Sequence, residues 1–120
     1  MYLRKEDNGV QNKVYGLMGF AARSRNLVTG YNTCLKLIPS GKIKLLIIAN
    51  DVGENTSQKL SQKCQSNNVP VVKYGTCEEL SKATGKEDKG LFGLTDKGFA
   101  ESIMREVEKE NKNKTEREVF

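Results

Sequence analysis

Lys44-Leu45-Leu46-Ile47-Ile48-Ala49 is a short, almost wholly apolar run that lies between polar segments of the chain. Apolar residues in an unbroken run of this length are typical of a β-strand that is covered on both faces. We therefore predict that this run forms the central strand of a sheet with helices on both sides. The polar, glycine-containing residues 50–55 follow it and predict a turn out of the strand.

Outward from this strand, helical and strand patterns alternate along the chain. Apolar residues at helical spacing predict helices, and short β-branched or apolar runs predict strands. The predicted helices cover residues 11–22, 31–38, 55–66, 77–85 and 96–110, and the other predicted strands cover residues 27–29, 71–74 and 91–94. This alternation predicts the α/β class, with helices on both sides of a small sheet.

The chain of 120 residues has the length of one ordinary domain. We predict a flexible N-terminal segment over residues 1–10, a single α/β domain over residues 11–110, and a polar, frayed tail over residues 111–120. The longest apolar run is far shorter than the roughly 20 residues that a membrane helix needs. The N-terminus also has no apolar core of the kind that makes a signal peptide. We expect a cytoplasmic protein without a membrane partner.

Local signals within the predicted helices indicate how they begin and pack. Gly16 and Gly19 interrupt the first helix, and we interpret them as positions of close packing on a neighbour, since each glycine costs roughly 1 kcal/mol against alanine. Thr76-x-x-Glu79 is a capping box at the start of the fourth helix, which Gly85 ends.

The charge of the chain is concentrated in one stretch. No aspartate or glutamate lies between Asp7 and Asp51, whereas six of the 20 basic residues do, so this stretch is about +6 and the remaining segments sum to about −1. The six are Lys13, Arg23, Arg25, Lys36, Lys42 and Lys44. A field of one sign attracts polyanions, which makes nucleic acid the first partner to consider. A chance arrangement in a basic protein is the alternative.

Signatures of enzymes and of metal sites are missing from the sequence. It contains no histidine, no phosphate-binding glycine loop and no nucleophile elbow. The three cysteines, Cys34, Cys64 and Cys77, form no C-x-x-C pair, so the usual zinc sets are excluded. We interpret them as buried, inert thiols at helical positions. We expect no catalysis, no cofactor, no metal and no small-molecule substrate.

Several motifs occur in a fixed order along the chain. Gly30-x-Asn32-x-x-x-Lys36 opens a helix, and the central strand runs into Asn50-Asp51. Further motifs are Val69-Pro70-Val71, Glu79-Leu80 and Ala83-Thr84-Gly85. Together they resemble the kink-turn RNA-binding ribosomal proteins of the L-seven-Ae and L-thirty-e family over about residues 12–100. The stretches 49–56 and 96–100 are especially similar to its bacterial YlxQ-type branch.

This resemblance implies a three-layer α/β/α sandwich with a small mixed sheet of about four strands. It also implies an RNA-binding face built from the Gly30 helix start, the end of the apolar strand and the loop after Gly85. Asn32 and Lys36 would contact guanine edges, for which an amide and a lysine are chemically suited. The full set of predicted RNA-binding residues is Gly30, Asn32, Thr33, Lys36, Arg23, Arg25, Lys42, Lys44, Lys86 and Lys89.

Two departures from the family pattern bear on function. Thr33 stands where many members have a glutamate, and residues 86–90 are polar where the loop of other members often has small apolar residues. We expect the partner to be a structured RNA that contains a kink-turn. Ribosomal RNA is one candidate. The alternative is a protein-interaction module of an RNA-associated assembly with a weakened RNA site.

Overall fold

The computed structural model describes residues 12–119, with side chains through residue 112. The predicted flexible segment 1–10 lies outside this range. Helices and strands alternate along the chain as predicted from the sequence. In order they are α2 (Lys13–Arg23), β1 (Leu27–Thr29), α3 (Tyr31–Leu37), β2 (Leu45–Ile48), α4 (Glu54–Ser66), β3 (Val71–Lys73), α5 (Cys77–Thr84), β4 (Leu91–Leu94) and α6 (Lys97–Val119).

The four strands form one mixed sheet in the order β1-β4-β2-β3. β4 runs antiparallel to β1 and to β2, whereas β2 and β3 are parallel. Leu27 and Leu45 both pair with Leu94, so β1 and β2 begin at the same end of the sheet. They also end together at the start of β4, where Thr29 pairs with Phe92 and Ile48 pairs with Leu91. The loops of the chain are thereby divided between two opposite ends of the sheet.

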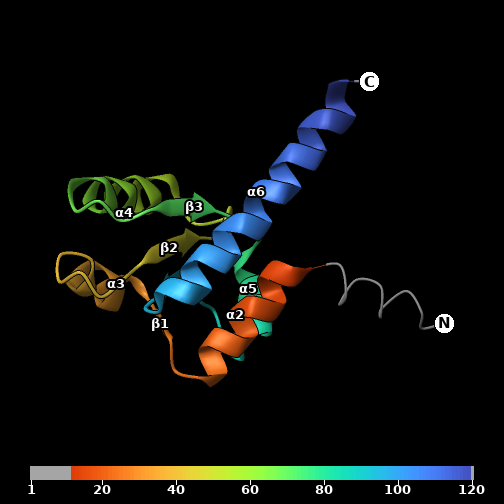
Figure 1. Ribbon diagram of the computed structural model, residues 1–120. Helices are drawn as coiled ribbons and strands as arrows, with labels where there is room; N and C mark the ends of the chain where they lie inside the picture. The colour runs from red at the N-terminus through yellow and green to blue at the C-terminus, as the bar shows by residue number, and fades with distance from the viewer. Residues whose placement is uncertain (1–11, 120) are drawn as a thin grey trace.

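Helices cover both faces of this sheet, which confirms the three-layer sandwich (Figure 1). All four residues of β2 are buried, as expected for a central strand. Leu45 and Ile47 pack into the core beneath α2, α5 and α6, while Leu46 and Ile48 pack against α3 and α4. The unbroken apolar run of the sequence therefore reflects burial on both sides of the strand.

The start of α5 differs in part from the predicted capping box. The Thr76 hydroxyl accepts a hydrogen bond from the backbone N–H of Glu79 at 3.1 Å, as predicted. The Glu79 carboxylate, however, accepts from the Tyr15 hydroxyl at 2.7 Å instead of reaching back to Thr76. Asp51 supplies a further acceptor at this helix start, since its carboxylate lies 2.9 Å from the N–H of Cys77. Thus α5 is capped by two side chains from different loops.

The two glycines of α2 have different surroundings. A Cβ atom at Gly19 would approach the carbonyl oxygen of Ala83 to 2.9 Å, so this glycine permits the close contact of α2 with α5. A Cβ at Gly16 would meet nothing within 4 Å. The interpretation of close packing is therefore confirmed for Gly19 and wrong for Gly16, which faces open space.

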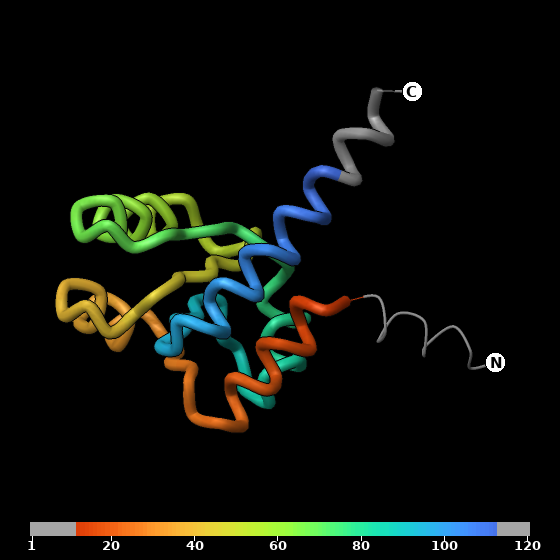
Figure 2. Tube along the Cα trace, in the orientation of Figure 1, coloured from red at the N-terminus to blue at the C-terminus, as the bar shows by residue number. Residues whose placement is uncertain are grey.

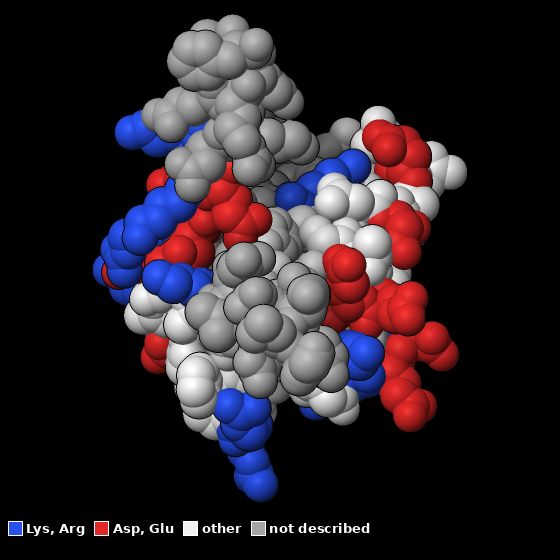
Figure 3. Space-filling model, turned by 90° about the vertical axis from the view of Figure 1, so that its right-hand side faces the viewer, with Lys and Arg blue, Asp and Glu red and all other residues white. Residues whose placement is uncertain are grey.

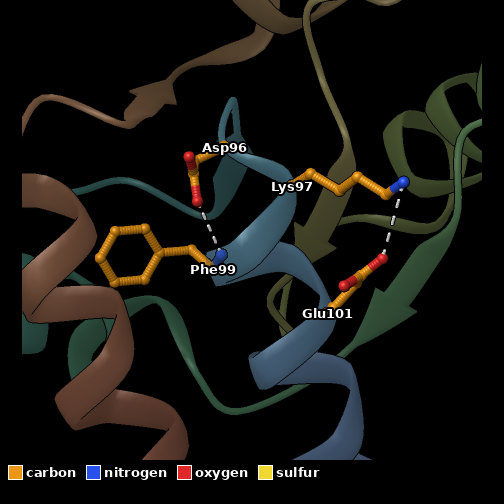
Figure 4. A network of polar contacts seen from close by, with 4 residues as sticks. All are labelled: Asp96, Lys97, Phe99 and Glu101. Carbon is orange, nitrogen blue, oxygen red and sulfur yellow. Dashed lines mark hydrogen bonds and ion pairs between the residues drawn. The ribbon is translucent and has the colours of Figure 1, made fainter.

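The last helix begins at Lys97, and the carboxylate of the preceding Asp96 accepts the N–H of Phe99 at 2.9 Å (Figure 4). Lys97 and Glu101 lie one turn apart in the same view, with 4.0 Å between their charged atoms. α6 lies beside α2 and reaches past the sheet (Figure 2). Its backbone is helical to Val119, beyond the predicted end at residue 110. Fraying of residues 111–120 in solution stays a prediction.

Candidate functional site

Three segments meet at the end of the sheet where β1 and β2 end and β4 begins. They are the start of α3, the loop after β2 (residues 49–53) and the loop after α5 (residues 85–90). The N–H of Gly30 donates to the carbonyl of Leu91 at 3.1 Å, and the N–H of Ala49 donates to that of Gly90 at 2.9 Å. These bonds hold the three segments together. We call this end of the sheet the α3 edge.

The helix start at this edge depends on glycine. Gly30 is the N-cap residue of α3 and has a φ of 97°, which residues with a side chain rarely adopt. It contributes no side-chain cap, so the chain turns here without covering the helix start. Cys34 and Ile38 are fully buried and fix the inward face of the helix.

Asn32, Thr33 and Lys36 are exposed on α3. Asn32 and Lys36 are one helical turn apart and lie on the same side of the helix. Asn32 is not the capping residue, since Gly30 occupies that position. Among the described residues, neither side chain has a hydrogen-bonding partner. An amide and an ammonium group therefore lie side by side with their polar atoms available to a ligand.

The loop after α5 is held by a residue that the sequence analysis missed. Ser81 is 5% exposed, and its hydroxyl accepts from the N–H of Lys89 at 2.9 Å and donates to the Lys89 carbonyl at 3.0 Å. The carbonyl of Ser81 also accepts the N–H of Lys86 at 2.9 Å. One serine thus fixes both ends of the loop. A serine inside a helix carries no sequence signal for such a role.

The charges around this loop are mixed. Lys86 lines a hollow that it shares with Lys82 and with four carboxylates. The four are Asp51, Glu78, Glu87 and Asp88. Hydrogen bonding from the Cys77 N–H lowers the pKa of the Asp51 carboxyl, which favours its charged form. Figure 3 shows acidic side chains on both sides of the face that it displays, with the larger group on the right of the view. The α5 side of the α3 edge is therefore acidic, and the α3 side is not.

Four of the predicted RNA-binding cations lie away from this edge. Arg23 and Arg25 precede β1, and Lys42 and Lys44 precede β2, so all four are at the opposite end of the sheet. The structure brings Gly30, Asn32, Thr33, Lys36, Lys86 and Lys89 to the α3 edge or the helix that starts there. The acid-free stretch is therefore no single surface, because each strand carries the chain from one end of the sheet to the other.

Cys34 and Cys64 are buried as predicted, whereas Cys77 is not fully buried. Cys34 and Cys64 are fully buried, and burial raises the pKa of their thiols to about 12 and about 11. Cys77 is partly buried, and its pKa is raised as well, first by desolvation and then by Asp51. Within residues 12–112 no three Cys, Asp or Glu side chains are arranged to hold a metal ion. No helix of the described chain is both long and apolar enough to cross a bilayer.

This geometry defines a class of protein, the three-layer α/β/α domain with exposed polar loops at one end of its sheet. The chain belongs to the ribosomal protein L7Ae/L30e/S12e/Gadd45 family, whose sequence profile matches residues 12–104. This confirms the family that the motifs indicated.

Relatives and solved structures agree with this assignment. A Bacillus subtilis (strain 168) protein named RNA-binding protein YlxQ is 32% identical over 90 residues, which cover 75% of this chain and 90% of the relative. The Enterococcus faecium protein of the same name is 32% identical over 102 residues, or 85% of this chain and 98% of the relative. A protein of unknown function from Bacillus halodurans C has a similar structure, with a TM-score of 0.78, 34% identity, and coverage of 80% and 97%.

Proposed function

We propose that this protein binds a kink-turn or similarly bent structured RNA at the α3 edge, without catalysing a reaction. The observation that carries the proposal is the placement of Asn32 and Lys36, exposed one turn apart beside the Gly30 turn and the Ser81-held loop. Membership of a ribosomal protein family and the similarity to two proteins named as RNA-binding support it.

The chemistry of these two side chains suits base edges. An amide offers both donors and an acceptor, and a lysine ammonium matches the O6 and N7 acceptors of guanine. In a regular A-form duplex the major groove is too narrow for such contacts, whereas a sharply bent RNA with non-canonical pairs exposes its base edges. Binding to the bent form would shift the RNA toward that form. Catalytic groups are not needed for this activity.

Ribosomal RNA is a candidate partner in the cytoplasm, since the family includes ribosomal proteins. A second candidate function is favoured by one observation: Lys86 is surrounded by carboxylates at the α5 side of the edge. Carboxylates repel RNA phosphates, and Thr33 also lacks the acceptor that many family members have there. An edge with these features would suit a protein-interaction module of an RNA-associated assembly.

Substitution of the two α3 side chains separates these functions. Asn32→Ala and Lys36→Ala should each weaken binding to a kink-turn RNA by about 1–3 kcal/mol and affect a straight duplex of equal length much less. Both residues are exposed, and Asn32 is not the helix cap, so melting temperatures should stay near that of the parent protein. Binding is measured by titration with both RNAs.

Lys63→Ala provides the matched control, because Lys63 is an exposed lysine in the last turn of α4, whereas the loop 49–53 of the α3 edge precedes the first turn of that helix. This substitution should weaken binding to the kinked and to the straight RNA slightly and equally. If Asn32→Ala and Lys36→Ala behave like this control, the two residues do not contact bases. Equal affinity of the unaltered protein for kinked and straight RNA would favour the protein-interaction alternative.

A further inference from the structure

The end of the sheet opposite the α3 edge carries a second group of cations. Three turns meet there, before β1, before β2 and after β4: the N–H of Lys44 donates to the Leu94 carbonyl at 2.7 Å, and the N–H of Thr95 donates to that of Asn26 at 2.9 Å. We call this surface the basic end. Its exposed cations are Arg23, Arg25, Lys42, Lys44 and Lys97.

Negative charge at the basic end is smaller than its positive charge, although Lys44 and Lys97 line a hollow that also contains Arg105, Glu101 and Glu108. Asp96 lies in the turn after β4, and its carboxylate is engaged by the N–H of Phe99 at 2.9 Å. Glu101 pairs only loosely with Lys97, with 4.0 Å between their charged atoms and side chains that are 61% and 79% exposed. Such exposed pairs neutralise little charge in water. The basic end therefore keeps a clear excess of positive charge.

A hollow of about 560 Å³ opens beside two of these cations, Lys42 and Lys44. It is lined by Val28, Leu37, Gly41, Lys42, Lys44 and Thr95. The Lys44 ammonium donates to the Gly41 carbonyl at 2.9 Å, which uses one of its three N–H groups and holds it at this turn. The hollow thus combines partly exposed aliphatic side chains with two ammonium groups.

We propose that the basic end is a second RNA-binding surface, which takes an unpaired stretch of RNA. Lysines and arginines would neutralise its phosphates, and one base would pack on Val28 and Leu37 in the hollow. A duplex is disfavoured, because its bases are stacked and paired and cannot enter the hollow. An acidic peptide would satisfy the cations but would leave the aliphatic part of the hollow unfilled.

The two ends of the sheet would then act independently. The α3 edge and the basic end lie at opposite ends of β1 and β2, so one protein could hold a bent RNA at the first and an unpaired strand at the second. The acid-free stretch contributes cations to both ends, because its strands carry the chain from one end of the sheet to the other. The inference extends the proposed function but concerns a different surface.

A ternary-complex experiment tests this proposal. The protein is first saturated with kink-turn RNA and then titrated with a labelled short oligouridine, and the same titration is made with protein alone. We expect oligouridine to bind in both cases without displacing the first RNA. Lys42→Gln with Lys44→Gln should weaken oligouridine binding about tenfold and lower its salt slope by about 1.4, at roughly 0.7 per phosphate contact. Affinity for kink-turn RNA should fall only slightly, and no more than in the control variant described next.

Lys59→Gln with Lys63→Gln is the matched control, since it removes the same charge from exposed positions of α4. Leu37→Ala tests the hollow. It should weaken oligouridine binding without changing its salt slope, and its melting temperature shows whether the variant is folded.

Three results would overturn the proposal. They are equal behaviour of the two double variants, displacement of oligouridine by kink-turn RNA, and binding of polyglutamate or a straight duplex as tightly as oligouridine. The titration with protein alone keeps this result separate from a failure of kink-turn recognition.

Discussion

Ser81 fixes the loop after α5, which forms one side of the α3 edge. Its buried hydroxyl makes two hydrogen bonds to the backbone of Lys89, one as donor and one as acceptor. Asp88, next to Lys89, has a φ of 52°, an uncommon backbone conformation for a residue with a side chain. A local constraint is needed to keep such a loop in one conformation, and Ser81 supplies it.

Ser81→Ala should loosen this loop while leaving α5 folded. The N–H of Lys89 would lose its partner and become accessible to water, so its hydrogen exchange should accelerate strongly. A cost of about 1 kcal/mol for ordering the mobile loop on binding should weaken kink-turn RNA binding about fivefold. Binding to a straight duplex should change little. Amide exchange and RNA titrations provide the two measurements.

Thr84→Ala is the control for this prediction. Thr84 is also buried on α5, but its hydroxyl bonds to the carbonyl of Leu80 within the same helix. The control should lower stability without accelerating exchange at Lys89 or altering RNA discrimination. Equal effects of the two substitutions on the loop would contradict a specific role for Ser81.

At this scale the sequence predicted some site features better than others. Gly30 and the exposed pair Asn32 and Lys36 follow from a local motif, because helical spacing alone decides which residues share a face. Ser81 could not be identified, since its role depends on the path of a loop that returns to it. The position of Lys86 among carboxylates could not be predicted either, because two of the four carboxylates come from other segments of the chain.

At the scale of elements, α2 contains a natural matched pair of glycines. Gly19 packs against the backbone of α5, whereas Gly16 faces open space, and both lie in the interior of the same helix. Helix propensity favours alanine at both positions by about 1 kcal/mol. The difference between the two positions therefore arises only from packing.

Gly16→Ala should stabilise the protein by up to about 1 kcal/mol, and Gly19→Ala should destabilise it by about 1–3 kcal/mol. The added methyl group at position 19 would lie 2.9 Å from the carbonyl oxygen of Ala83, and backbone of α5 would have to move. Denaturant unfolding of the two variants measures both effects. Stabilisation by Gly19→Ala would show that α2 and α5 do not pack as closely as described.

Most elements were predictable from sequence because their signals are local. The order of helices and strands followed from periodicity, and Thr76 caps α5 as its capping box predicted. Asp96, the first residue of the range predicted for the last helix, caps α6. The end of α6 was not predicted, because its apolar spacing ends at Val107 and a polar helix beyond the core has no period to detect. Glu and Lys are good helix formers, which is consistent with a helical backbone there.

At the scale of the whole molecule, topology decides where charge lies. The acid-free stretch is continuous in sequence, yet its cations are divided between the α3 edge and the basic end. Carboxylates from outside the stretch reach the α5 side of the α3 edge. Sequence order predicts the amount of charge but not the end of the sheet to which each loop returns. The α3 edge is therefore less basic than the sequence suggested.

This arrangement predicts that removing carboxylates strengthens RNA binding. Glu87→Gln with Asp88→Asn should tighten binding to kinked and straight RNA by about two- to fivefold at low salt, since exposed charges interact weakly in water. Asparagine tolerates the positive φ of position 88, so the loop should keep its backbone. The gain should shrink as salt is raised, because screening removes the repulsion in the parent protein as well.

Two exposed carboxylates on α6 provide the control for this last prediction. Glu101→Gln with Glu108→Gln changes the net charge by the same amount but lies outside the α3 edge. If long-range charge alone governs binding, both double variants will bind kink-turn RNA more tightly by the same factor. A larger gain in affinity from the substitutions at positions 87 and 88 would place the RNA next to the loop after α5. No gain in affinity from those substitutions would contradict the prediction and would place the RNA on the α3 side, beyond the reach of those charges.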